Sequence, residues 1–181
     1  MSTALLIIDV QQALCTGVAP VLEAAPVIQR INQASAWARS QGMPVIFVQH
    51  EEAAEPWCFD CPGWQLAKGL HAMAHEPRVR KQTPDAFNQT ELEGLLKARG
   101  ITRLLVCGMQ SDFCVDTSVR RALSLGYDVV LLGDAHTSVD NGVLTAAQII
   151  AHHNATFASM TSFGPRIRVM PVAALYASAI R

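Results

Sequence analysis

Polar side chains follow four short apolar runs of the chain, and their types are those of a nucleophilic hydrolase. The residues in this position are Asp9, His50, Lys81 and the segment from Gly108 to Cys114. A cysteine can attack a carbonyl carbon once a neighbouring carboxylate accepts its proton. A lysine can hold that carboxylate in place and stabilise negative charge. These residue types therefore predict attack by Cys114, with Asp9 as the proton acceptor and Lys81 as its partner.

Cys114 is expected in the first turn of a helix that begins near Asp112. Unpaired backbone N–H groups and the helix dipole favour an anion there, so this placement predicts a lowered thiol pKa and a site for an oxyanion. Each residue also has a structural interpretation: Cys114 as a small buried side chain, Asp9 as a turn cap and Lys81 as a surface charge. Their coincidence at three strand ends favours a shared site.

The elements that must position these residues alternate between short β-rich runs and longer helical stretches, as in repeated βαβ units. The expected strands are Ala4–Ile8, Val45–Gln49, a short one ending at Lys81, Leu104–Cys107, Val129–Leu132 and Arg166–Met170. The expected helices are Pro20–Gln41, Asn88–Arg99 with Asn88 or Thr90 as N-cap, Asp112–Leu125, Val143–Phe157 and a short terminal one. We expect one α/β domain over residues 1–181, a three-layer α/β/α sandwich with a mostly parallel, Rossmann-like sheet of about six strands.

Ligands of open parallel sheets bind beyond the carboxyl ends of the strands, where all four polar groups are expected. The stretch from Glu51 to Glu76 lacks periodicity, and a loop of that length is usually functional. Its aromatic residues Trp57, Phe59 and Trp64 are expected to wall the pocket, although large aromatics are more often core or interface residues.

Composition restricts the partners. The 181 residues have a formal net charge of -1, and 16% are charged, which argues against nucleic acid and favours a small, neutral or mildly polar ligand. No apolar run reaches the ~18 residues of a membrane span. The five cysteines form an odd set, and no secretory signal is recognisable, so we expect a reducing, cytoplasmic setting.

Three segments in this order resemble the isochorismatase-like cysteine hydrolases, a family that also includes nicotinamidases and other amidohydrolases. They are LLIIDVQ (Leu5 to Gln11), RKQTPDAF around Lys81, and CGMQSDFCVDTSVRRALSLGYDVVLLGDAHTS (Cys107 to Ser138). The resemblance covers nearly the whole chain. It implies a hydrolase of small amides or cyclic amides that forms a thioester intermediate.

The resemblance also implies an Asp-Lys-Cys triad, which falls on Asp9, Lys81 and Cys114. It implies a non-proline cis peptide between Met109 and Gln110 that aims backbone N–H groups into the oxyanion site. The expected substrate pocket comprises Gln11, His50, Trp64, Phe87, Phe113 and His136. Members are commonly oligomeric, and the apolar surface of Trp37, Trp57, Trp64 and the terminal LYASAI segment likewise predicts a dimer or higher homo-oligomer.

Other activities remain open alternatives. The nicotinamidase branch holds a metal through an Asp-x-His pair, but here the corresponding stretch is Val48-Gln49-His50-Glu51, so we expect no metal and no cofactor. Cleavage of isochorismate itself is less favoured, because Gly-Met-Gln before the nucleophile is typical of a broader group. Non-catalytic binding is disfavoured, because all three triad positions keep suitable residues.

A second group of metal-ligand types lies in the long loop. Cys58-x-x-Cys61 followed by His71-x-x-x-His75 has the residue types of a zinc site, with closer spacing than a zinc finger. The favoured interpretation is a reduced active-site loop. His50 and His136 follow expected strands, but the proposed triad needs neither as an acid or a base.

Overall fold

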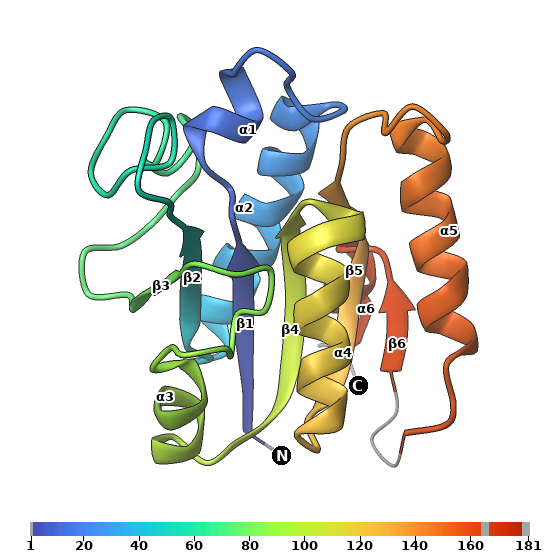
Figure 1. Ribbon diagram of the computed structural model, residues 1–181. Coiled ribbons are helices and arrows are strands. Elements are labelled where there is room, and N and C mark those ends of the chain that lie inside the picture. The colour runs from blue at the N-terminus through green and yellow to red at the C-terminus, as the bar shows by residue number, and fades with distance from the viewer. Residues whose placement is uncertain (1, 164–166, 179–181) are drawn as a thin grey trace.

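The computed structural model describes residues 2–163 and 167–178, and its strands form one fully parallel sheet (Figure 1). The strands are β1 (Ser2–Ile8), β2 (Val45–His50), β3 (Arg78–Lys81), β4 (Ile101–Met109), β5 (Asp128–Thr137) and β6 (Ile167–Met170). Their order across the sheet is β3-β2-β1-β4-β5-β6, and every neighbouring pair is parallel. The expected α/β class is confirmed, with a sheet that is parallel throughout. Arg166, expected in the last strand, lies outside the described residues.

Helices cover both faces of this sheet and complete three layers (Figure 1). They are α1 (Gln12–Thr16), α2 (Ala24–Ser40), α3 (Leu92–Ala98), α4 (Asp116–Ser124), α5 (Ala146–Ser159) and α6 (Ala173–Ser178). Leu5 and Ile7 of β1 pack on the face with α2 and α6, whereas Leu6 and Ile8 pack with α3, α4 and α5. Because side chains alternate along a strand, a strand covered on both faces is apolar throughout.

The helix beginnings differ from the expected ones. The helix expected from Pro20 starts at Ala24, and α1 precedes it. In α3, the N-cap is Glu91 rather than Asn88 or Thr90, and the Thr90 hydroxyl accepts a hydrogen bond from the Leu92 amide instead. These boundaries depend on the packing of the loops, which leaves little trace in the spacing of apolar residues.

Helix α5 also starts later than expected, at Ala146. Its N-cap is Thr145, which forms a reciprocal capping box with Gln148 and so satisfies two of the first free backbone amides. Val143, expected inside this helix, is exposed in the loop before it.

The segment with Cys114 is a single π-helical turn, η1 (Ser111–Val115), followed by α4. The sequence predicted one continuous helix from Asp112 to Leu125. Just before this turn, Gly108 has a φ of 123°, and a Cβ there would lie 2.0 Å from the Ile8 carbonyl oxygen. Only glycine allows β4 to approach β1 this closely.

The long loop after β2 has little regular structure, as expected. Residues 51–77, all of them described, contain no helix and no named strand, and Leu66 makes an isolated bridge to Gln11. Among the described residues, no helix has the length and apolar character needed to cross a membrane.

Candidate active site

The structure brings Asp9, Lys81 and Cys114 together at the carboxyl ends of the strands. The Lys81 ammonium nitrogen lies 2.7 Å from Asp9 Oδ2 and donates a hydrogen bond to Cys114 Sγ across 3.1 Å. Asp9 and Lys81 are each about 1% exposed. Asp9 Oδ1 is also buried and has no hydrogen-bond partner among the described residues. One carboxylate oxygen is thus held by the ammonium, and the other is left free.

Three elements place these groups. Asp9 directly follows β1 and takes a φ of 51°, a left-handed conformation that aspartate tolerates better than most residues. Lys81 ends β3, two strands away, and its side chain reaches past β2 to the carboxylate. Cys114 lies in η1, immediately after β4.

The charges around Cys114 oppose one another. Burial raises the pKa of the Cys114 thiol to about 12, and the Asp9 carboxylate adds to this rise, while Lys81 opposes it. Burial disfavours the Lys81 ammonium, but the charges of Asp9 and Cys114 outweigh burial, and the pKa of Lys81 is raised. The expected lowering of the thiol pKa is therefore wrong, because burial and a carboxylate overcome the effect of a helix start.

His50 extends this group toward the entrance. Its Nδ1 lies 3.4 Å from the Lys81 nitrogen, and its Nε2 lies 3.1 Å from Glu52 Oε1. Because an ammonium can only donate, this geometry fits a neutral ring that accepts at Nδ1 and donates from Nε2. Lys81 can then direct one N–H group to each of Asp9, Cys114 and His50.

These residues open into a cavity of about 400 Å³, which we call the Cys114 cavity. Its lining combines apolar, polar and charged side chains: Asp9, Leu14, His50, Glu52, Trp57, Gln82, Pro84, Gln110, Phe113 and Cys114. Of the residues expected in the substrate pocket, His50 and Phe113 do line it, and so does Trp57 from the long loop. Leu14, Glu52, Gln82 and Pro84 were missed, because they lie in loops or in the unexpected helix α1.

Four expected pocket residues lie elsewhere: Gln11, Trp64, Phe87 and His136 are buried and do not line this cavity. Phe87 stacks on Tyr127 with ring centroids 6.0 Å apart, inside the core. Trp64 packs edge-on against Phe59 at 4.9 Å. A large apolar side chain near a site packs into the core unless its loop turns it toward the cavity. Which of the two orientations it takes cannot be predicted from the neighbouring sequence.

Gln11 and His136 instead form hydrogen bonds that connect the segments around the site. The Gln11 amide donates to the carbonyl oxygens of His50 and Trp64, and its oxygen accepts from the His50 amide. His136 lies within β5, which is longer than the strand expected from the sequence. Its Nδ1 is hydrogen-bonded to Ser111 Oγ at 2.8 Å, and its Nε2 to Asn154 Oδ1 at 2.9 Å. Burial lowers the pKa of His136, which fits a neutral bridge between η1 and α5.

The loop between β4 and η1 has the cis peptide bond that the family resemblance implies, between Met109 and Gln110. Met109 is fully buried, and Gln110 lines the Cys114 cavity. The Gln110 carbonyl accepts hydrogen bonds from the amides of Phe113 and Val115, which closes the turn around Cys114.

The alternative zinc ligands are not assembled. Cys61 Sγ donates to the Pro56 carbonyl, and the backbone of His71 is held by Asn32 and Arg39 of α2. Within residues 2–163 and 167–178, no three His, Cys, Asp or Glu side chains are grouped as metal ligands. In the stretch from Val48 to Glu51, which corresponds to the Asp-x-His pair of nicotinamidases, the Gln49 side chain donates a hydrogen bond to the Trp64 carbonyl.

The chain is similar in sequence to known proteins. The isochorismatase domain family matches residues 3–164. A streptothricin hydrolase from Streptomyces noursei is 42% identical over 140 residues, which cover 76% of this chain and 50% of that protein. A ureidoacrylate amidohydrolase from Pseudomonas syringae pv. syringae is 28% identical over 173 residues, covering 74% of this chain and 69% of that protein. The chain thus spans about half the length of the streptothricin hydrolase.

The fold is also similar to that of solved structures. The crystal structure of an isochorismatase family protein superimposes with a TM-score of 0.85 at 36% identity, covering 93% of this chain and 97% of that one. Sequence and fold are therefore matched over most of the described chain, and the protein belongs to the isochorismatase family of hydrolases.

Proposed function

We propose that this protein is a cysteine-dependent hydrolase that cleaves the C–N bond of a small amide or cyclic amide through a thioester on Cys114. The observation that carries the proposal is the contact of Lys81 with both Asp9 and Cys114, at 2.7 and 3.1 Å, in the wall of an open cavity. The name of the ureidoacrylate amidohydrolase supports C–N cleavage, and the named streptothricin hydrolase supports hydrolysis.

In the first half of the reaction, the free oxygen of Asp9 accepts the thiol proton as Cys114 Sγ attacks the carbonyl carbon. Backbone N–H groups around the Met109–Gln110 bond and at Cys114 are our candidates for binding the oxyanion. Asp9 then passes the proton to the amide nitrogen, the C–N bond breaks, and the amine leaves. The acyl group remains on sulfur as a thioester.

In the second half, Asp9 accepts a proton from water, and the water oxygen attacks the thioester carbonyl. The C–S bond breaks and Asp9 returns the proton to the thiolate, so one amide and one water yield one acid and one amine. Lys81 keeps Asp9 Oδ1 free by holding Oδ2, and it lies within hydrogen-bond distance of the sulfur. A proton acceptor beside the sulfur allows attack by a thiol whose own pKa is high.

The test combines turnover with mass analysis. Amides, lactams, nicotinamide and streptothricin are screened for release of ammonia or amine, and the protein is weighed intact after brief mixing with a substrate. We expect an acyl adduct on Cys114 that is absent in Cys114→Ala. Asp9→Asn should lower the rate by at least ~10², as for a lost general base, and Lys81→Ala should also impair turnover.

Cys58→Ala and Cys61→Ala are the matched controls, because both remove thiols from the neighbouring loop without touching the proposed triad. Each should keep partial or full activity. Wild-type turnover by Cys114→Ala, or an adduct on Cys58 or Cys61, would show that the assignment is wrong.

We further propose that the protein acts in the cytoplasm. All five cysteines, each within the described residues, are free thiols, which suits a reducing compartment.

A further inference from the structure

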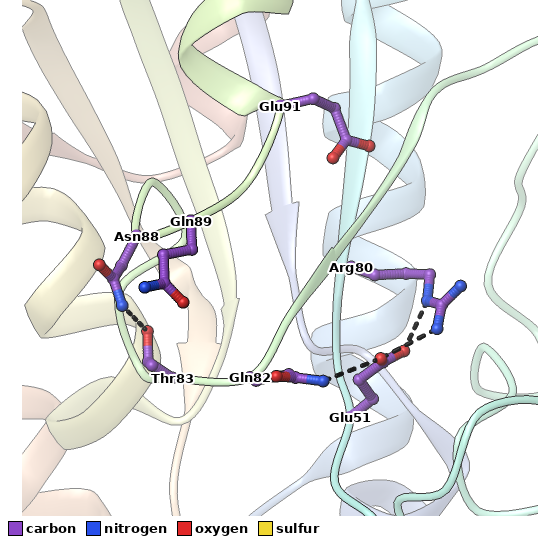
Figure 2. A pocket seen from close by; sticks show the side chains of 7 residues that line it. All are labelled: Glu51, Arg80, Gln82, Thr83, Asn88, Gln89 and Glu91. Carbon is purple, nitrogen blue, oxygen red and sulfur yellow. Dashed lines mark hydrogen bonds and ion pairs between the residues drawn. The ribbon is translucent and has the colours of Figure 1, made fainter.

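A second cavity adjoins the Cys114 cavity, and its lining is entirely polar. It has a volume of about 410 Å³, and we call it the polar compartment. Figure 2 shows its lining residues: Glu51, Arg80, Gln82, Thr83, Asn88, Gln89 and Glu91. They come from the end of β2, from β3, and from the connection between β3 and α3.

The two cavities meet at Gln82, which lines both. Consecutive residues after β2 also line different cavities: Glu51 lines the polar compartment, while His50 and Glu52 line the Cys114 cavity. Lys81, immediately before Gln82, contacts the Cys114 sulfur. The two cavities are therefore neighbours that share the Gln82 side chain as part of their lining.

One charge pair in the polar compartment is internally neutralised. Arg80 donates to both oxygens of Glu51, at 2.6 and 2.9 Å (Figure 2). Its guanidinium also lies 3.9 Å from the centre of the Phe59 ring. Gln82 also donates to Glu51, at 3.4 Å. The charge of Arg80 is therefore balanced by Glu51, and one face of its guanidinium lies against the Phe59 ring.

The remaining groups favour a cation. Glu91 makes no ion pair or side-chain hydrogen bond with a described residue, although its charge acts on Arg80. Gln89, beside it, likewise makes no side-chain hydrogen bond within the described part of the chain. Because the charges of Glu51 and Arg80 cancel, the lining has one net negative charge, on Glu91. The side-chain oxygens of Thr83, Asn88 and Gln89 add hydrogen-bond acceptors.

We propose that the polar compartment binds a cationic, N–H-rich group of the substrate, an alkylammonium or guanidinium group joined to the amide that is cleaved at Cys114. Glu91 supplies the charge that selects it. This inference rests on the proposed amide hydrolysis, because the cationic group is placed relative to the amide that is cleaved. It narrows the substrate class, which the proposed triad alone does not define.

Two experiments separate this inference from the proposed function. In the first, agmatine is titrated into Cys114→Ala and into the same variant with Glu91→Gln. We expect saturable binding that Glu91→Gln weakens by roughly tenfold, the order expected for loss of one charge-assisted hydrogen bond. Because no turnover is involved, this result does not depend on the hydrolysis mechanism.

The matched control is Glu93→Gln. Glu93 lies two residues away but is paired with Lys97 at 2.6 Å and does not line the compartment. It should leave agmatine binding unchanged. Absence of saturable binding, or equal effects of Glu91→Gln and Glu93→Gln, would overturn the inference.

In the second experiment, straight-chain amides are compared with and without a terminal amino group. The wild-type protein should prefer the amino form in kcat/KM, Glu91→Gln should reduce that preference by roughly tenfold, and Glu91→Lys should shift it toward amides with a terminal carboxylate. Hydrolysis through Cys114 with a preference that ignores Glu91 would reject the compartment but keep the proposed function. Glu91-dependent agmatine binding without hydrolysis of any amide would support the cation site and reject the proposed function.

Discussion

The Cys114 thiol lies between a carboxylate and an ammonium that act on its pKa in opposite directions. Burial is the largest influence and favours the neutral thiol, Asp9 favours it further, and Lys81 favours the thiolate. The result is a pKa of about 12, so the sulfur holds its proton at neutral pH. This arrangement suits a mechanism in which the proton leaves for Asp9 during attack.

This balance predicts how Cys114 titrates. The ultraviolet thiolate absorbance of the wild-type protein, minus that of Cys114→Ala, should show no Cys114 signal between about pH 6 and pH 10. The sign follows from the raised pKa, because a thiol remains protonated below it. Asp9→Asn removes a charge that raises the pKa, so the Cys114 signal should appear at lower pH in that variant. A Cys114 thiolate at neutral pH in the wild-type protein would contradict this account.

At the scale of elements, the site depends on how closely β4 approaches β1. Gly108 lies opposite Ile8 in the register of these strands, immediately before the turn with Cys114. The same turn is tied to the rest of the fold through Ser111, which bonds to His136 of β5. Ser138 likewise donates a hydrogen bond to Asp112 of η1. Cys114 is thus positioned by contacts between elements rather than by its own short turn.

Replacing Gly108 by alanine tests this approach. The φ of 123° alone should cost ~1–3 kcal/mol of unfolding free energy, and the clash with Ile8 should add to it. Gly126→Ala is the matched control, because Gly126 also has a positive φ, of 91°, but has open space around its Cβ position. Urea denaturation should show a clearly larger loss for Gly108→Ala. Equal losses would mean that the strand contact tolerates a methyl group.

The apolar surface that the sequence suggested for a contact between copies is only partly exposed. Trp64 is only 5% exposed, and Trp37 and Trp57 are half-buried. In the terminal segment, Leu175 is buried, whereas residues 179 and 180 lie outside the described chain. Among the described residues, Val18 and Val143, in the loops at residues 17–23 and 138–145, are the most exposed large apolar side chains. Leu22 and Leu144 of the same loops are also exposed, as are Phe59, Met73, Phe113 and, in the terminal segment, Tyr176.

We propose that the protein forms a dimer or higher homo-oligomer and that these loops contribute to the contact, because exposed valines and leucines gain from burial. Light scattering at micromolar concentration should give at least twice the monomer mass. The double variant Val18→Lys and Val143→Lys should reduce that mass, whereas Gln41→Lys, which adds a charge at another exposed position, should not. A wild-type monomer would reject the proposal.

Much of the fold and the three central residues could be predicted from the sequence, because their signals are local. An apolar run such as Leu5 to Ile8, closed by Asp9, indicates a strand buried on both faces, and repeated βαβ order requires parallel neighbours. Parallel strands end at one edge of the sheet, which is why the sequence places Asp9, Lys81 and Cys114 in one site.

The tertiary structure decided the properties that depend on distant neighbours. The raised pKa of Cys114 comes from burial and from Asp9, over a hundred positions earlier in the chain. Phe87 and Trp64 turned out to be buried, while Gln82 and Glu52 face the Cys114 cavity. The physical reason is that apolar periodicity records which side of a regular element is buried, whereas a loop has no such period. Its side chains are oriented only by the packing and hydrogen bonds of the folded chain.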